Sequence, residues 1–115
     1  MAWCRYYWGR AMGILVICSY RPKPGHEDEA CRLVNAHVPL LRRHRLITAR
    51  KSVTGMGKDG ELVEIFEWMS SDTSRAAAAN PQIMAHWNAM GEVMDFVPLA
   101  SFPEAQQPFA HFAPV

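Results

Sequence analysis

The segment over residues 61–87 constrains the fold of this chain more than any other. It reads ELVEIFEWMSSDTSRAAAANPQIMAHW. Residues 62–68 are rich in β-branched and aromatic side chains, which predicts a strand that ends at Trp68. A polar turn and an Ala-rich helix up to about Ala79 follow. Asn80-Pro81 then predicts the start of a second helical segment, because asparagine caps helices well and proline suits the first helical position.

The first half of the chain predicts a strand, a helix and another strand. Residues 14–20 are apolar on both faces, as in a central strand. An acidic first turn and apolar residues at helical spacing predict a helix that ends near Arg45, with Pro39 expected to kink or split it. Residues 47–53 predict the second strand, and the glycine-rich segment 55–60 predicts a hairpin loop.

The last part of the chain completes the predicted topology. Pro98 is expected to stop the last helix, and residues 99–102 are expected to form a fourth strand. The order strand, helix, strand, strand, helix, strand favours an α+β fold, a ferredoxin-like sandwich with a four-stranded antiparallel sheet and both helices on one face. An apolar, uncovered sheet face on so small a domain is expected to bind a second copy of the chain.

Composition limits the domain count and the classes of function. A chain of 115 residues predicts one domain, over residues 12–105, with an N-terminal extension over residues 1–11 and an apolar tail over residues 106–115. The net charge of +1 and the lack of a long basic block argue against nucleic acid as a partner. No apolar run reaches the roughly 20 residues of a membrane span. The three cysteines have no disulfide or metal-binding spacing, which suggests free thiols in the cytoplasm.

Two histidines and one glutamate are candidates for chemistry. His37 lies on the apolar stripe of the first helix and His86 borders that of the last, although such histidines more often complete a core through a hydrogen bond. Glu64 lies mid-strand among apolar residues, where an unpaired buried carboxylate is costly. A partner such as Arg50, Lys51 or a histidine on the same sheet is therefore expected. The histidines have no metal-ligand spacing, so no metal site is expected.

Three segments of the chain carry a resemblance to a known family. EIFEWMS, NPQIMAHW and DFVPLA are together similar to the antibiotic-biosynthesis-monooxygenase-like domains, which are dimeric α/β barrels. The resemblance covers about residues 12–105. It implies a homodimer. Members of the family include monooxygenases that need no cofactor and oxidise aromatic or polycyclic compounds with dioxygen. It also implies a ligand pocket between sheet and helices, lined by Tyr20, His37, Phe66, Trp68, His86 or Trp87, and Met90.

Oxygenation without a cofactor sets demands on this pocket. The substrate must lose a proton, so that its anion can pass an electron to dioxygen, and the protein must supply a dry pocket, a base and orientation. On this interpretation Phe66 and Trp68 stack on the substrate, Glu64 lies in the pocket wall, and His37 or His86 takes the proton. The alternative is a non-enzymatic homodimer that binds a ligand or serves as a structural partner, with the pocket packed solid.

The family also contains haem-degrading oxygenases, which give a third interpretation. Trp68 falls where those proteins carry a pocket tryptophan. They need an asparagine on the first strand, where this chain has Cys18 or Ser19. They also need an iron-binding histidine on the last helix, where Trp87 falls here and His86 lies one residue short. One residue on a helix turns a side chain by about 100°, so haem ligation is not expected.

Overall fold

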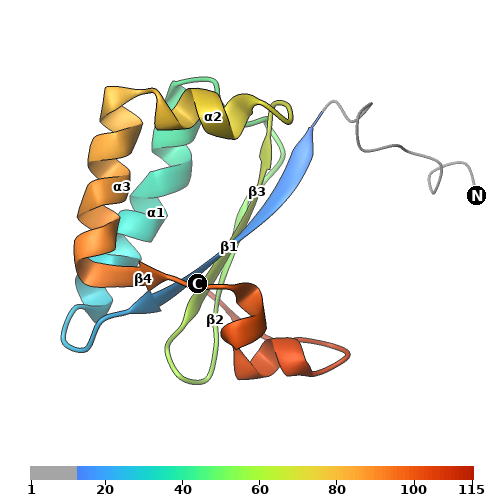
Figure 1. Ribbon diagram of the computed structural model, residues 1–115. Coiled ribbons are helices and arrows are strands. Elements are labelled where there is room, and N and C mark those ends of the chain that lie inside the picture. Colours follow the sequence, from blue (N-terminus) through green and yellow to red (C-terminus); the bar gives the residue numbers. More distant parts are fainter. Residues whose placement is uncertain (1–12) are drawn as a thin grey trace, which may run out of the picture.

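The computed structural model describes residues 13–115, so the predicted extension over residues 1–11 lies outside the described residues. One antiparallel sheet has the strand order β4-β1-β3-β2-β5. The α-helices lie on one face of this sheet, and the C-terminal segment lies on the other side (Figure 1). The α+β, ferredoxin-like prediction is confirmed at this level, but the sheet has five strands where four were predicted.

The two central strands follow the sequence prediction closely. β1 (Ile14–Pro22) and β3 (Leu62–Trp68) pair from Ile14 opposite Trp68 to Tyr20 opposite Leu62. Alternation along a strand sends neighbouring side chains to opposite faces. The face of β3 that meets the helices therefore carries four buried side chains: Leu62, Glu64, Phe66 and Trp68.

The helices pack their apolar stripes on this face. α1 (Glu27–Arg43) is continuous through Pro39, so of the two predicted effects of this proline, a kink or a split, the split does not occur. α2 (Thr73–Ala78) is short, and α3 (Pro81–Val93) lies alongside α1. The Asn80 side chain caps α3 by accepting hydrogen bonds from two backbone N–H groups, as its sequence predicted.

The second strand lies further along the chain than residues 47–53. β2 is Val53–Met56, and residue 47 forms only an isolated bridge to Trp68. The reason is a local turn: the backbone N–H of Arg50 donates to the Thr48 hydroxyl, which competes with strand pairing. The Arg50 side chain and the Thr48 hydroxyl both bind Glu67 instead.

The fourth strand precedes the predicted segment 99–102. α3 stops before Pro98, and β4 (Met94–Phe96) pairs at once with the end of β1. The predicted strand segment forms a 3-10 helix instead, η3 (Leu99–Ser101), and η4 (Pro103–Gln106) follows it. Prolines before and after η3 lack the amide that a strand ladder requires, which explains why no strand forms here.

The C-terminal tail docks on its own chain. β5 (Ala113–Pro114) adds to the edge of β2, and Phe112 packs against the fully buried Phe102 at 6.2 Å between ring centroids. Gly55 in β2 allows this contact, since a Cβ atom there would lie 2.7 Å from the Phe112 Cβ. The tail thus covers part of the sheet face opposite the helices.

Candidate functional site

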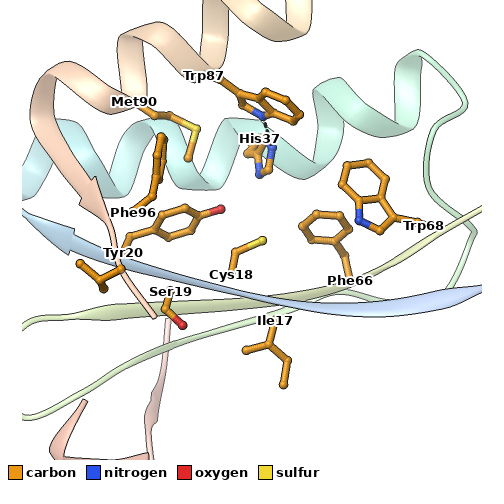
Figure 2. Close-up of a pocket in the computed structure, with 11 residues that line it drawn as sticks. Ile17, Cys18, Ser19, Tyr20, His37, Phe66, Trp68, Trp87, Met90 and Phe96 are labelled. Atoms are coloured by element: carbon orange, nitrogen blue, oxygen red, sulfur yellow. Dashed lines mark hydrogen bonds between the residues drawn. The ribbon is translucent and has the colours of Figure 1, made fainter. Parts of the chain in front are cut away.

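A cavity of about 370 Å³ lies between the sheet and helices α1 and α3 (Figure 2). We call it the front cavity. Most of its wall is apolar, as is usual for a small-molecule site. The side chains of Ile17 and Ser19 point to the far side of β1, so these two residues do not present their side chains to it. The front cavity is lined by Ile17, Cys18, Ser19, Tyr20, His37, Phe66, Trp68, Trp87, Met90, Phe96 and Val97.

A chain of hydrogen bonds runs through the cavity wall. The Trp87 Nε1–H donates to His37 Nε2 at 2.9 Å, and His37 Nδ1 lies 2.8 Å from Glu64 Oε1. The indole N–H can only donate, so His37 Nε2 must accept. The ring is therefore neutral with its proton on Nδ1, and it donates this proton to Glu64. The Tyr20 hydroxyl donates to the same Glu64 oxygen at 2.8 Å.

This network explains the carboxylate in the middle of β3. Glu64 is 1% exposed, and a buried carboxylate needs strong donors to offset its lost hydration. The expected partner was Arg50, Lys51 or a histidine on the sheet. The structure pairs Arg50 with Glu67, and it supplies His37 from α1 together with Tyr20 from β1.

Two further groups beside Glu64 hold their protons firmly. Burial raises the pKa of the Tyr20 hydroxyl far above its usual value, and the nearby Glu64 carboxylate raises it further. Burial also raises the pKa of the Cys18 thiol to about 11, although its hydrogen bond with Tyr20 opposes this. At neutral pH both groups are protonated. Tyr20 is then a hydrogen-bond donor, and Cys18 is a poor nucleophile.

The two candidate catalytic histidines differ in their access to the front cavity. His37 lines the front cavity, whereas His86 does not. The His86 Nε2 lies 2.9 Å from the Leu33 carbonyl oxygen, and its ring stacks parallel to that of His37 at 5.9 Å between centroids. Glu64 reaches the cavity through Tyr20 and His37 rather than lining it directly.

The candidate substrate-binding residues do come together. Tyr20, Phe66, Trp68, Trp87 and Met90 all line the front cavity, and the Phe66 and Trp68 rings meet edge to face at 5.0 Å between centroids. Sequence reasoning missed Cys18 as a wall residue, because it weighed this position only as part of a haem site. It also missed two wall residues whose segment was assigned to the last helix and its end. These are Phe96 and Val97. The apolar run before Pro98 was the available signal.

The donor set of the cavity wall does not fit haem iron. Both ring nitrogens of His37 are engaged by Trp87 and Glu64, and His86 faces a backbone carbonyl. Among residues 13–115 no group of three or more histidine, cysteine, aspartate or glutamate side chains is arranged to hold a metal ion. In the same part of the chain, no helix is both long and apolar enough to cross a bilayer.

The fold of the chain is also found among solved structures. A solved structure with a similar fold is a mutant of SnoaB, a cofactor-independent oxygenase from Streptomyces nogalater. The TM-score is 0.60 with 18% sequence identity, over 82% of this chain and 100% of that chain. At this identity the likeness concerns the fold alone. No protein-family profile and no curated protein matches the sequence.

Proposed function

We propose that the protein is a cofactor-independent monooxygenase that oxidises an aromatic or polycyclic compound in the front cavity. The observation that carries this proposal is the buried Glu64 carboxylate, which Tyr20 and His37 connect to an apolar cavity of suitable size. A carboxylate that can accept a proton, next to a mainly apolar binding space, meets the main demands of this chemistry. The similar fold of SnoaB supports the same class of reaction.

For a substrate whose methylene group is made acidic by neighbouring aromatic rings, the proposed reaction converts this group into a carbonyl. The substrate first loses a proton, and its anion gives an electron to dioxygen. The two radicals combine to form a carbon–oxygen bond. The oxygen–oxygen bond then breaks, so that one oxygen atom stays in the product and the other leaves as water. This water carries the hydrogen that remained on the carbon and one proton taken from solvent, which replaces the proton lost in the first step. The carbon is oxidised and dioxygen is reduced, which balances the step without a further reductant.

The geometry suggests how the residues share the work. Phe66 and Trp68 give the substrate aromatic faces to stack on. The Tyr20 oxygen has a free lone pair and can accept the substrate proton while its own proton passes to Glu64. His37 donates to Glu64 and accepts from Trp87, so it is a positioning residue that holds the carboxylate in place.

The test is dioxygen uptake by the purified protein with aromatic compounds that carry an acidic methylene or hydroxyl group. Flavin, metal ions and reductants are left out. The expected result is catalytic uptake of one dioxygen for each product molecule, with some compounds and not others. Compounds that bind in the cavity and are recovered unchanged, with no uptake, would contradict the proposal.

A non-enzymatic ligand-binding protein is the second candidate. It is favoured by one observation: the buried polar groups of the wall already satisfy one another, through Trp87, His37, Glu64 and Tyr20. Such a protein would bind apolar aromatic compounds without any acidic proton as tightly as those that have one. Isothermal titration with matched pairs of compounds distinguishes the two candidates, because a proton-abstracting site prefers the acidic member.

We also propose that the protein forms a homodimer through the sheet face opposite the helices. Three side chains on this face are widely exposed, namely Leu15 at 61%, Ile17 at 50% and Val53 at 54%. Ile17 and Val53 both lie opposite Ile65 in the sheet, so they form one apolar patch rather than scattered contacts. The tail covers only the neighbouring part of this face, and a second copy of the chain would cover the rest.

A further inference from the structure

A second cavity, of about 450 Å³, lies on the other side of Glu64. We call it the rear cavity. It is lined from α1 and from the β2–β5 edge of the sheet, and it shares no lining residue with the front cavity. Its lining residues are Val34, Asn35, Val38, Pro39, Arg42, Lys51, Ser52, Val53, Thr54, Glu64, Pro114 and Val115.

The sheet register places Glu64 between the two cavities. Cys18 lies opposite Glu64 on one side, and Thr54 lies opposite it on the other. Directly opposed residues of antiparallel strands present their side chains on the same face, so the three form a row across the sheet. Cys18 lines the front cavity and Thr54 lines the rear cavity. Glu64 therefore connects the two cavities: it lines the rear cavity, and it reaches the front cavity through Tyr20 and His37.

The two cavities differ in what they can hold. The front wall is mainly apolar, as a dry reaction space requires. The residues that line the rear wall include the uncharged polar residues Asn35, Ser52 and Thr54, together with Arg42 and Lys51. A water molecule needs room and two to four polar partners to be held. The rear cavity meets both conditions beside Glu64.

We propose that Glu64 exchanges protons between the front cavity and water in the rear cavity. The inference deepens the proposed function, since it names the route by which the substrate proton leaves the site. Thr54 is the positioning residue, because it lies directly opposite Glu64 in the sheet and lines the same rear cavity. The front cavity then loses a proton by a route that requires no water within it.

Each proton transfer in this route is balanced. The substrate gives a proton to the Tyr20 oxygen, and Tyr20 gives its own hydroxyl proton to Glu64 Oε1, with which it already forms a hydrogen bond of 2.8 Å. Glu64 then releases a proton to a water molecule in the rear cavity. Tyr20 and Glu64 return to their starting states, the substrate is left as an anion, and the proton has moved to solvent.

The experiment measures hydrogen exchange in the protein without any substrate. His37 donates its Nδ1 proton to Glu64, so this proton reports on the proton traffic of the carboxylate. Its exchange with water is followed by NMR on protein with labelled histidine, at fixed pH, in the wild type and in Thr54→Val. This substitution keeps the side-chain shape and removes the hydroxyl. We expect exchange to slow by about tenfold, the effect of one lost hydrogen-bonding partner for the water.

Two further variants complete the test. Thr54→Ser keeps a hydroxyl and is expected to exchange at the wild-type rate. Thr48→Val makes the same chemical change at a threonine that binds Glu67 and lines neither cavity, so it is also expected to leave exchange unchanged. Equal exchange in Thr54→Val and wild type would overturn the inference. So would equal slowing in Thr48→Val.

An apolar compound that fills the front cavity provides an independent arm. If protons travel through the rear cavity, the compound leaves the exchange of the His37 proton unchanged. If they travel through the front cavity, the compound slows it, and the inference is wrong. Because these measurements involve no turnover, they can succeed where the oxygenase proposal fails, and they can fail where it succeeds.

Discussion

Glu64 is the residue on which both the stability and the chemistry of the front cavity depend. One of its oxygens accepts hydrogen bonds from Tyr20 and His37, and the residue is almost fully buried. When a buried charge loses a hydrogen-bond donor, the free-energy cost of its removal from water is no longer offset. This cost is larger than the net contribution of a typical hydrogen bond. Substitutions around this carboxylate should therefore affect stability more than their size suggests.

Tyr20→Phe tests this dependence, because it keeps the ring and removes one donor to Glu64. The free energy of unfolding is expected to fall by about 1–3 kcal/mol. Urea unfolding followed by tryptophan fluorescence measures it. Thr48→Val is the matched control, since it removes a hydroxyl from the less buried Glu67 and should cost less. A loss in Tyr20→Phe no larger than the control would mean that Glu64 does not need this donor.

Cys18 makes the stability depend on pH in the alkaline range. Its thiol pKa rises from 9.0 to about 11 in the folded protein, so the folded state holds this proton more tightly than the unfolded state does. The resulting stabilisation is complete below pH 9.0 and is lost as the pH rises to about 11. It amounts to about 3 kcal/mol. Tyr20, whose pKa is also raised, continues the decline at higher pH.

Denaturant unfolding at a series of pH values checks this prediction. Cys18→Ser keeps the approximate shape of the side chain but does not titrate in this range, so its unfolding free energy should decline less between pH 9 and pH 11 than that of the wild type. Cys31→Ser is the control, because its thiol is more exposed. Parallel pH profiles for wild type and Cys18→Ser would contradict the prediction.

The sequence could show that Glu64 needs a partner, but not which one. The cost of a buried carboxylate follows from its place in an apolar strand, but the histidine among the expected partners was one on the sheet, not on a helix. The actual partners lie 27 and 44 positions away along the chain, on α1 and β1. Their meeting depends on how a helix packs over a sheet, which no local pattern encodes.

The elements of the fold divide into those with strong local signals and those without. β1, β3 and the capped start of α3 were predicted because their apolar patterns and the Asn80-Pro81 cap are local. β2, β4 and β5 were misplaced or missed. They span only two to four residues, which is too short for a periodic pattern, and their positions are fixed by pairing with longer strands.

Gly55→Ala tests how the tail is held on the sheet. A Cβ atom at this position would lie 2.7 Å from the Phe112 Cβ, so Phe112 and β5 must move. We expect a loss of about 1–3 kcal/mol in the unfolding free energy and faster proteolysis of the tail. Gly91→Ala is the matched control. Its Cβ would meet only the Phe96 ring at 3.9 Å, and alanine in a helix is expected to add up to about 1 kcal/mol. Equal proteolysis of the tail in both variants would contradict this account.

At the scale of the whole molecule, the two faces of the sheet serve different purposes. One face carries the helices and both cavities. The other is only partly covered by the C-terminal segment (Figure 1). Its exposed apolar side chains are proposed to form a dimer interface. Such a dimer would also shield the backbone of β1, the strand that supplies Tyr20 and Cys18 to the site.

The double variant Leu15→Lys, Val53→Lys tests the dimer. Both residues are exposed on the uncovered face, and a buried lysine pair would strongly disfavour association. We expect the dissociation constant of the dimer, measured by sedimentation velocity over a concentration series, to rise by at least about 100-fold. Phe109→Lys is the control, because Phe109 is exposed in the tail rather than on a strand. A wild type that is monomeric at high concentration would contradict the proposal.

The most direct test of the oxygenase account is the turnover number of Glu64→Gln on a compound that the wild type oxidises. Glutamine keeps the shape and one acceptor oxygen but cannot take up the proton. The account predicts that kcat falls by about 100-fold or more while KM changes little. Glu67→Gln, which alters a carboxylate outside the front-cavity wall, is predicted to turn over like the wild type. Equal turnover in Glu64→Gln and Glu67→Gln would show that Glu64 does not take part in removing the proton from the substrate.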